Sequence, residues 1–180
     1  MSAFWTYTMG VYGRDGVQPS VIHLQDARDA DVNLLLYAMW TANLGLPAFD
    51  STHVAFLASR VRAWREAAIE PLRAVRTGMR DGVVHVPEDE AEGLRKQILK
   101  LEIEAERIEQ LIIESANSEA KGKESGEPDP SVVAENLAAV MALSDGENDE
   151  ADLASMRALV EAACQEAGST AVDAAMSLIS

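Results

Sequence analysis

Helical hydrophobic periodicity, repeated over most of the chain, is the feature that most constrains how these 180 residues can fold. In the clearest stretch, which follows a capping Asp50 or Ser51, apolar residues recur at steps of three and four and so share one helix face. This series consists of Val54, Leu57, Val61, Trp64, Ala68, Leu72 and Val75. A second series, with heptad spacing, consists of Leu94, Ile98, Leu101, Ala105, Ile108 and Ile112. The short stretch 83–86 has no second strand to pair with, so the sequence predicts an all-α protein.

Composition and helix breakers divide the chain into four parts. Residues 1–82 predict a compact helical bundle, and residues 87–117 predict a long acidic amphipathic helix that could form a coiled coil or dock on a partner. Residues 118–130 have the composition of a flexible linker, so the acidic helical segment 131–180 is expected to be tethered to the rest. Pro71 should kink or split the helix that contains it.

The individual helices follow from caps and breakers. In the bundle they are expected over 3–12, 19–27 and 32–43, and in the C-terminal segment over 131–143, 152–166 and 169–179. Asp29 or Asp31 should cap the helix that begins at Val32. That helix has almost no polar face, so we expect it to be central and buried.

The charge of the chain is unevenly distributed. Residues 1–80 sum to +1 and residues 81–180 to −16, which together give the net charge of −15. Phosphate binding needs a basic surface that such an acidic half would repel, so the sequence argues against nucleic-acid or anionic-membrane partners. The lack of an N-terminal signal segment and of a long apolar stretch predicts a cytoplasmic protein.

Motifs of most enzyme classes are missing from the sequence. It contains no phosphate-binding glycine motif and no GxSxG element, and its one cysteine, Cys164, lies on an apolar helix face near acids. The acidic loop 145–150 does not match a calcium-binding loop, because the required glycine falls on Glu150. We therefore predict neither a cofactor nor a metal.

An arginine stripe is the first candidate site. Five arginines fall in one sector of the long amphipathic helix, beside its apolar face: Arg62, Arg65, Arg73, Arg76 and Arg80. Because guanidinium groups bind carboxylates and phosphates bidentately, the stripe could dock an acidic partner or an anion. The alternative is that Glu66, Glu70 and the acidic helix 88–119 neutralise it within the chain.

A polar cluster between two predicted helices is the second candidate site. It comprises Gln25, Asp26, Asp31 and Asn33. Such residues usually cap helices, but a carboxylate pair with an amide could also bind a cation or transfer protons. His23 lies three residues before Asp26, a spacing at which both could reach one metal, yet no second pair accompanies them.

Several sequence words in fixed order resemble a family of uncharacterised proteobacterial proteins that carry a domain of unknown function. They are Phe4-Trp5, Leu24-Gln25-Asp26, residues 31–37 with Trp40, Trp64-Arg65, and Pro71-Leu72-Arg73 with Arg76. The resemblance covers residues 3–80 and extends less strongly to residues 105–110. It implies a bacterial, cytosolic helical protein and assigns no catalytic role to any residue.

Two functions remain open from the sequence. The first is a cytosolic adaptor or regulatory protein that acts by protein–protein contacts through the arginine stripe and the acidic tail, which could cover the stripe until a partner displaces it. The heptad series also makes a homodimer plausible. The alternative is a small-ligand- or metal-binding helical domain, or an enzyme, that uses the polar cluster.

Overall fold

The computed structural model describes residues 2–179, which fold into helices and connecting loops without a strand. The all-α class is therefore confirmed. In chain order the elements are α1 (Ala3–Val11), α2 (Val17–Arg28), α3 (Val32–Asn43), α4 (Ser51–Trp64), the π-helical turn η1 (Arg65–Ile69), α5 (Glu70–Gly78), α6 (Glu88–Ala116), the 3-10 turn η2 (Ser118–Ala120), α7 (Pro130–Met141), α8 (Glu150–Ala163) and α9 (Ser169–Met176). Within the described residues, no helix combines the length and apolar character that crossing a membrane requires.

Side-chain caps fix where several helices begin. The hydroxyl of Ser2 accepts a hydrogen bond from the Trp5 N–H, and the Asp31 carboxylate accepts from the N–H groups of Asn33 and Leu34. Asp50 caps α4 in the same way. These caps satisfy amide groups that have no partner within the helix. Of the two caps that the sequence allowed for α3, Asp31 is the one used, whereas Asp29 ends α2 in a left-handed conformation with φ of 52°.

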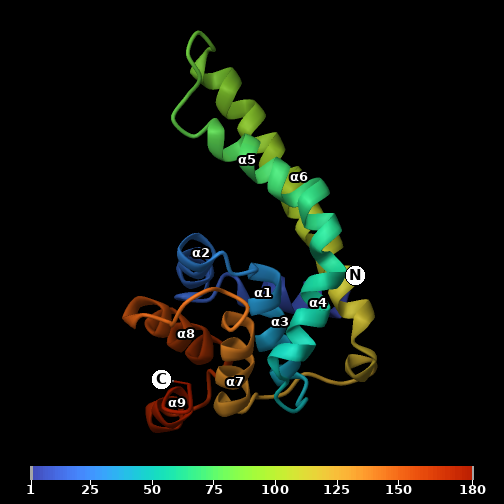
Figure 1. Cartoon of the computed structure of the whole chain (residues 1–180), viewed down its shortest axis with the longest axis vertical. Helices are drawn as coiled ribbons and strands as arrows, with labels where there is room; N and C mark the ends of the chain where they lie inside the picture. The colour runs from blue at the N-terminus through green and yellow to red at the C-terminus, as the bar shows by residue number, and fades with distance from the viewer. Residues whose placement is uncertain (1, 180) are drawn as a thin grey trace.

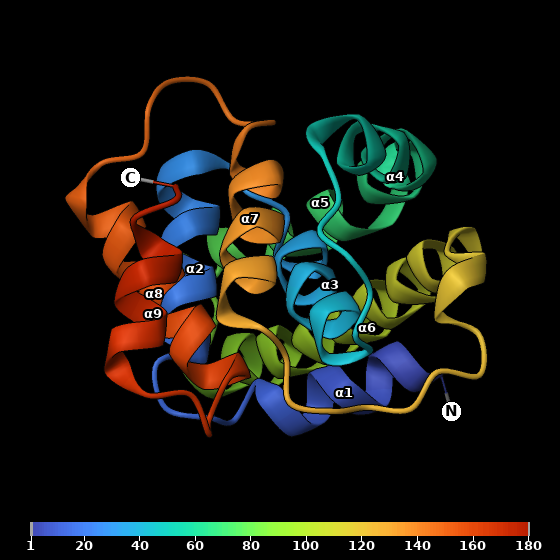
Figure 2. The same cartoon turned by 90° about the horizontal axis from the view of Figure 1, so that it is seen from below.

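A globular body forms around α3. Every residue of α3 from Asn33 to Ala42 is buried, and the helix, which lies near the centre of the view in Figure 2, contacts α1, α2, α6, α7 and α8. The rings of Phe4 and Trp40 stack with their centroids 5.0 Å apart. Burial of such rings and of the leucines of α3 contributes favourably to the free energy of folding.

The C-terminal helices belong to the same body. A helix tethered by a flexible linker would not share the core, but α7 packs on α3 and α8 packs on α2. Leu137 and Leu159 are completely buried. The preceding loop is also attached, because the Gly126 N–H donates to the Asn43 carbonyl at 2.8 Å. The linker-like composition of residues 118–130 did not reveal this packing, because it carries no information about the apolar faces of the helices that come after the linker.

A two-helix arm (residues 65–106) projects from the body (Figure 1). One side of it is η1 and α5, which continue the rod of α4, and the other side is the N-terminal part of α6, which runs back antiparallel. The π turn precedes Pro71, and in it the Glu70 N–H donates to the carbonyl of Arg65, five residues earlier. Pro71 has no N–H to donate, so the helix is disturbed where the sequence predicted, near Glu70.

Candidate functional site

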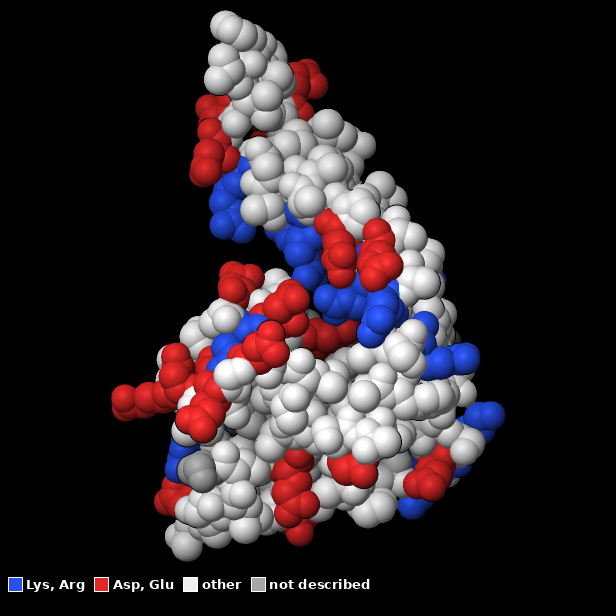
Figure 3. Space-filling view, in the orientation of Figure 1, with Lys and Arg blue, Asp and Glu red and all other residues white. Residues whose placement is uncertain are grey.

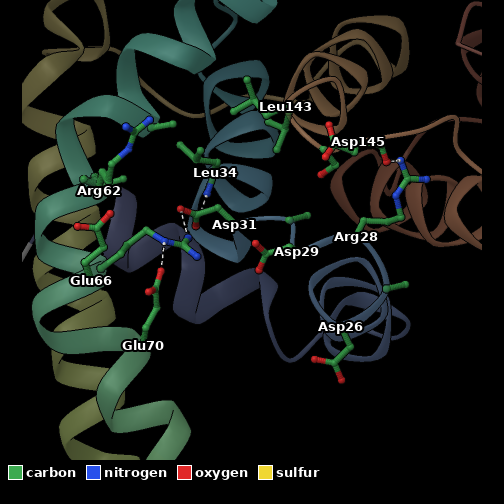
Figure 4. A pocket seen from close by; sticks show the side chains of 17 residues that line it. Asp26, Arg28, Asp29, Asp31, Leu34, Arg62, Glu66, Glu70, Leu143 and Asp145 are labelled. Atoms are coloured by element: carbon green, nitrogen blue, oxygen red, sulfur yellow. Dashed lines mark hydrogen bonds and ion pairs between the residues drawn. The ribbon is translucent and has the colours of Figure 1, made fainter.

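A cavity of about 570 Å³ lies between the base of the arm and the body. The end of α2 and its turn to α3 form one wall, α4 with η1 forms the wall opposite, and the end of α7 with the loop after it lines a further side. Figure 4 shows Asp29 and Asp31 on the first wall, facing Arg62, Glu66 and Glu70 on the second. In the space-filling view of Figure 3, the same region is a notch between the arm and the body. Both walls carry charges of both signs, so the cavity favours a polar occupant.

The structure divides the predicted polar cluster into two pairs. Asp31 and Asn33 point inward: the Asp31 carboxylate forms an ion pair with Arg65, and the Asn33 side chain is buried against α6. Gln25 and Asp26 instead hydrogen-bond to each other near the surface of α2, with 3.2 Å between Nε2 and Oδ1. Asp26 still borders the cavity. The four residues therefore do not converge on one point.

A chain of buried side-chain hydrogen bonds ties α6 to the body. The Thr8 hydroxyl donates to Oε1 of Gln110 at 3.1 Å, and Nε2 of Gln110 donates to Oδ1 of Asn33 at 2.7 Å. Asn33 in turn donates from Nδ2 to Oε2 of Glu109 at 2.6 Å. Buried polar groups are stable only when they are paired, so these bonds fix one position of α6 on α1 and α3.

Glu109 is the most perturbed carboxyl in the described chain. Its side chain is only 1% exposed, and Oε1 has no hydrogen-bond partner, although Nη1 of Arg65 lies 3.9 Å away. Burial, followed by the charge of Asp31, raises the pKa of Glu109 to about 9. Near neutral pH this carboxyl therefore keeps its proton, beside an ion pair that borders the cavity. Chemically, the group can hold a proton or release it if its surroundings become more polar.

The arginine stripe is largely paired with α6. Nε of Arg73 donates to Oε1 of Glu102 and Nη2 donates to Oε1 of Glu106, each at 3.0 Å. Arg76 also pairs with Glu102. We call these four residues the Arg–Glu ladder. Burial acts to raise the pKa of Glu102, but the hydrogen bonds from Arg76 and Arg73 outweigh it and lower that pKa below its usual value.

The five arginines of the stripe thus have different surroundings. Arg65, Arg73 and Arg76 form ion pairs with acids of the chain itself. Arg62 borders the cavity and Arg80 is exposed near the end of the arm, and neither has an ion pair within the described residues. The acids that pair with the stripe include Asp31 and Glu70, next to Arg65, and Glu102 and Glu106 of α6, and within the described residues none of them belongs to 131–179. The stripe is therefore not an open basic face.

The acidic loop before α8 is organised by an arginine. Arg28 donates from Nη1 to the carbonyl of Glu147 at 2.6 Å and from Nη2 to the carbonyls of Asp145 and Gly146 at 2.7 and 2.9 Å. It also pairs with the fully buried Asp152 at 2.8 Å. A guanidinium therefore occupies the position in which a cation-binding loop would hold its ion.

His23 faces this same acid and not Asp26. Its Nε2 lies 3.1 Å from Oδ1 of Asp152, and Asp149 is close enough for the three side chains to reach one ion. The hydrogen-bonding capacity of Asp152 is already used, because its Oδ2 pairs with Arg28 and also accepts from the Asp149 N–H at 3.2 Å. The arrangement is accounted for as a helix cap with an ion pair.

The opposite side of the arm is mostly uncharged, with Glu90 at its tip end in the same sector of α6 as Leu94 and Leu101. On helical spacing, the side away from the Arg–Glu ladder carries Pro71, Ala74, Val75 and Gly78 of α5 and Leu94, Gln97 and Leu101 of α6, all of them exposed. We call these seven residues the uncharged flank. Leu94 and Leu101 belong to the heptad series but are 50% and 58% exposed, whereas Ile98 and Ala105 are buried. The one helix that faces this part of α6 covers the row with Ile98 and Ala105 and leaves the row with Leu94 and Leu101 in solvent.

The sequence analysis named Glu70, which pairs with Arg65, but it missed the individual acids of α6 that pair with the stripe. Glu102 and Glu109 are seven residues apart, and each comes four residues after a buried apolar residue of the heptad series, Ile98 and Ala105. Two carboxylates on the apolar face of a helix are a signal that the sequence contained. Gln110, which completes the buried hydrogen-bond chain, gave no comparable signal.

The fold and the site together define a class, an all-α protein in which a globular body carries a projecting two-helix arm. The chain belongs to the family described as "protein of unknown function (DUF2390)", whose model matches residues 3–113. The match ends in the last turns of α6, so α7, α8 and α9 lie outside it although they complete the body. No curated protein and no solved structure matches the chain.

Proposed function

We propose that this chain is a helical protein-interaction module and that its arm docks on a protein partner. The observation that supports this most strongly is the distribution of exposed large apolar side chains. Of fourteen in residues 2–179, eight lie on the arm: Val75, Val83, Val84, Val86, Leu94, Leu99, Leu101 and Ile103. Single exposed apolar residues are ordinary on protein surfaces, but a concentration on one projecting element is typical of interaction sites.

The partner that best fits the uncharged flank is an apolar helix face of another protein. Ala74 and Gly78 are small and exposed, so a second backbone can approach α5 closely, while Leu94 and Leu101 offer large apolar contacts. A second copy of this chain fits less well. With −15 on each copy, self-association would bring like charges together.

In this proposal the arginines shape the arm and do not contact the partner. The Arg–Glu ladder joins α5 to α6 on one side of the arm. The uncharged flank, on the other side, then stays exposed to solvent. The acidic C-terminal segment completes the body instead of covering the arginines. An adaptor role would then depend on apolar contacts of the arm more than on its charges.

The test replaces apolar residues of the flank with acids. Leu94→Glu/Leu101→Glu is compared with the wild type and with Ile22→Glu/Leu178→Glu, a body variant that adds the same charge at exposed apolar positions. A protein captured from a lysate of the native cells is purified and its binding reconstituted. The proposal predicts binding to the wild type and the body variant and loss with the flank variant. Equal binding by all three chains contradicts it.

A second candidate function rests on the cavity. Its volume of about 570 Å³ is within the range of small-molecule sites, and Asp31 and Arg65 border it. A ligand present at 100 times its dissociation constant would stabilise the fold by about 2.7 kcal/mol. Thermal unfolding with a metabolite and metal panel tests this, with Asp29→Asn as a variant that alters the cavity wall. An unchanged melting temperature throughout the panel counts against this function.

A further inference from the structure

We propose that the tip of the arm (residues 79–90) binds a basic amphipathic segment of the partner, one that presents apolar side chains together with Lys or Arg. This inference rests on the proposed function, because it names the chemistry of the partner that the arm would dock on. It concerns a different surface from the uncharged flank, so the two can be tested separately.

The tip exposes three valines in a loop without regular structure. Val83, Val84 and Val86 are 43%, 81% and 45% exposed. They do not contribute to a core, and in water such side chains are a cost that burial against a partner would remove. Their clustering at the most distant point of a projecting arm (Figure 1) places them where a partner can reach them.

The loop holds these valines in a defined conformation. The Val86 N–H donates to the Val83 carbonyl at 3.0 Å, which closes a turn. Within that turn His85 has φ of 67°, a left-handed conformation that is rare for a residue with a side chain. Strained backbone of this kind is concentrated at binding and switch sites, because the free energy it costs must be compensated.

The charges around the valines are acidic. Asp81, Glu88, Asp89 and Glu90 are all exposed and have no ion pair within the described residues, and the basic side chains among the tip residues are those of Arg80 and His85. Figure 3 shows acidic side chains on both sides of an uncharged end of the arm. The three acids at the start of α6 also stabilise that helix end. This effect on the helix end does not account for Asp81, nor for the valines that lie between Asp81 and Glu88.

Charge complementarity therefore selects the occupant. An apolar patch rimmed by carboxylates fits a segment that combines apolar residues with Lys or Arg. A second copy would bring the same acids face to face, and an anionic membrane or a nucleic acid would be repelled in the same way.

The direct test uses a synthetic helical peptide of Leu and Lys, about four turns long, with a Leu/Glu peptide of the same pattern as its counterpart. Fluorescence anisotropy measures the dissociation constant for the wild type, for Val83→Ser/Val84→Ser/Val86→Ser and for Glu88→Gln/Asp89→Asn. Because the whole chain is acidic, Glu124→Gln/Glu135→Gln serves as a matched control that removes two exposed acids elsewhere. The inference predicts binding at least about tenfold weaker for either tip variant, a change of about 1.4 kcal/mol, and unchanged for the control.

Three outcomes would overturn the inference. They are equal affinity of all four chains for the Leu/Lys peptide, equal binding of the Leu/Glu peptide, and a shift of the wild type to twice its mass in the absence of peptide. The captured partner then separates this inference from the proposed function. If the partner is lost by Leu94→Glu/Leu101→Glu but kept by both tip variants, the arm docks a protein and the tip inference is wrong. If the flank variant and both tip variants all bind the partner as the wild type does, the proposed function fails as well.

Discussion

The body and the arm are built from the same secondary structure but are held together by different interactions. In the body, α3 is buried along ten consecutive residues and contacts α1, α2, α6, α7 and α8. In the arm, two helices face each other alone, and part of their interface consists of the Arg–Glu ladder. Two helices in contact can each bury only one stripe, so the arm must leave other apolar residues in solvent. The body therefore holds most of the buried core, and the arm leaves apolar surface uncovered, which is the surface that the proposed function uses.

The largest expected effect tests whether the C-terminal helices are part of the body. Leu137→Ala removes a completely buried side chain of α7, the helix that packs on α3. We expect it to lower the free energy of unfolding by about 2–5 kcal/mol, the range for buried leucine truncations. Leu178→Ala, at a position 60% exposed, serves as the control in the same urea titration. A negligible effect of Leu137→Ala would mean that residues 130–141 do not belong to the core.

The next effect tests the Arg–Glu ladder. Glu102→Ala leaves Arg73 and Arg76 without their shared carboxylate and should destabilise the arm by about 1–3 kcal/mol. Hydrogen exchange should speed up in α5 and in the facing part of α6, while the amides of α3 remain protected. Glu104→Ala, which removes only a surface pair with Arg107, should change exchange far less. Uniform loss of protection over the whole chain would contradict the separation of arm and body.

Glu109 sharpens the comparison through pH, because it lies where α6 passes from the arm into the body. Its pKa is raised in the folded chain, to about 9 from an ordinary value of 4.5, so the folded state binds more protons than the unfolded state between these values. Its contribution to stability is therefore full below about pH 4.5 and is lost as the pH rises towards 9.

Glu109→Gln removes this titration while an amide oxygen can still accept from Asn33. Urea titrations of both chains at pH 5 and pH 9 should show the variant gaining up to about 5 kcal/mol relative to the wild type at the higher pH, because each pH unit between the two pKa values costs the wild type about 1.4 kcal/mol. The difference between the two chains cancels the general repulsion of an acidic protein at high pH. A constant difference across this range would mean that Glu109 titrates normally.

The smallest expected effect concerns the tip. Val84→Ser should change the free energy of unfolding by less than about 0.5 kcal/mol, because the side chain is 81% exposed. Thermal unfolding measures this. A large loss of stability would show that the tip packs on the rest of the chain and is not available to a partner.

The sequence predicted those features that depend on neighbours along the chain. The helical periodicity, the Asp50 cap and the disturbance before Pro71 are all local signals, and the structure contains each of them. The central position of α3 also followed, because a helix without a polar face has to be surrounded.

Features that depend on which helices meet were not predicted. The packing of α7 and α8 on the body could not be read from a linker composition, and the heptad series did not reveal that Leu101 faces solvent. The pairing of Arg73 with Glu102 joins residues 29 positions apart in different helices. The sequence suggested that Glu66, Glu70 and an acidic helix could neutralise the arginines, and Glu70 does pair with Arg65, but the sequence did not identify which acids of that helix take part.

Site-specific cross-linking tests the central claim, that the arm contacts a protein partner, most directly. A photoreactive phenylalanine analogue is placed at Leu101 on the uncharged flank or at Leu178 on the body, both exposed, in cells that produce the chain. The account predicts an adduct with a protein of different mass at position 101 and none at position 178. No adduct at position 101, or the same adducts at both positions, would contradict it.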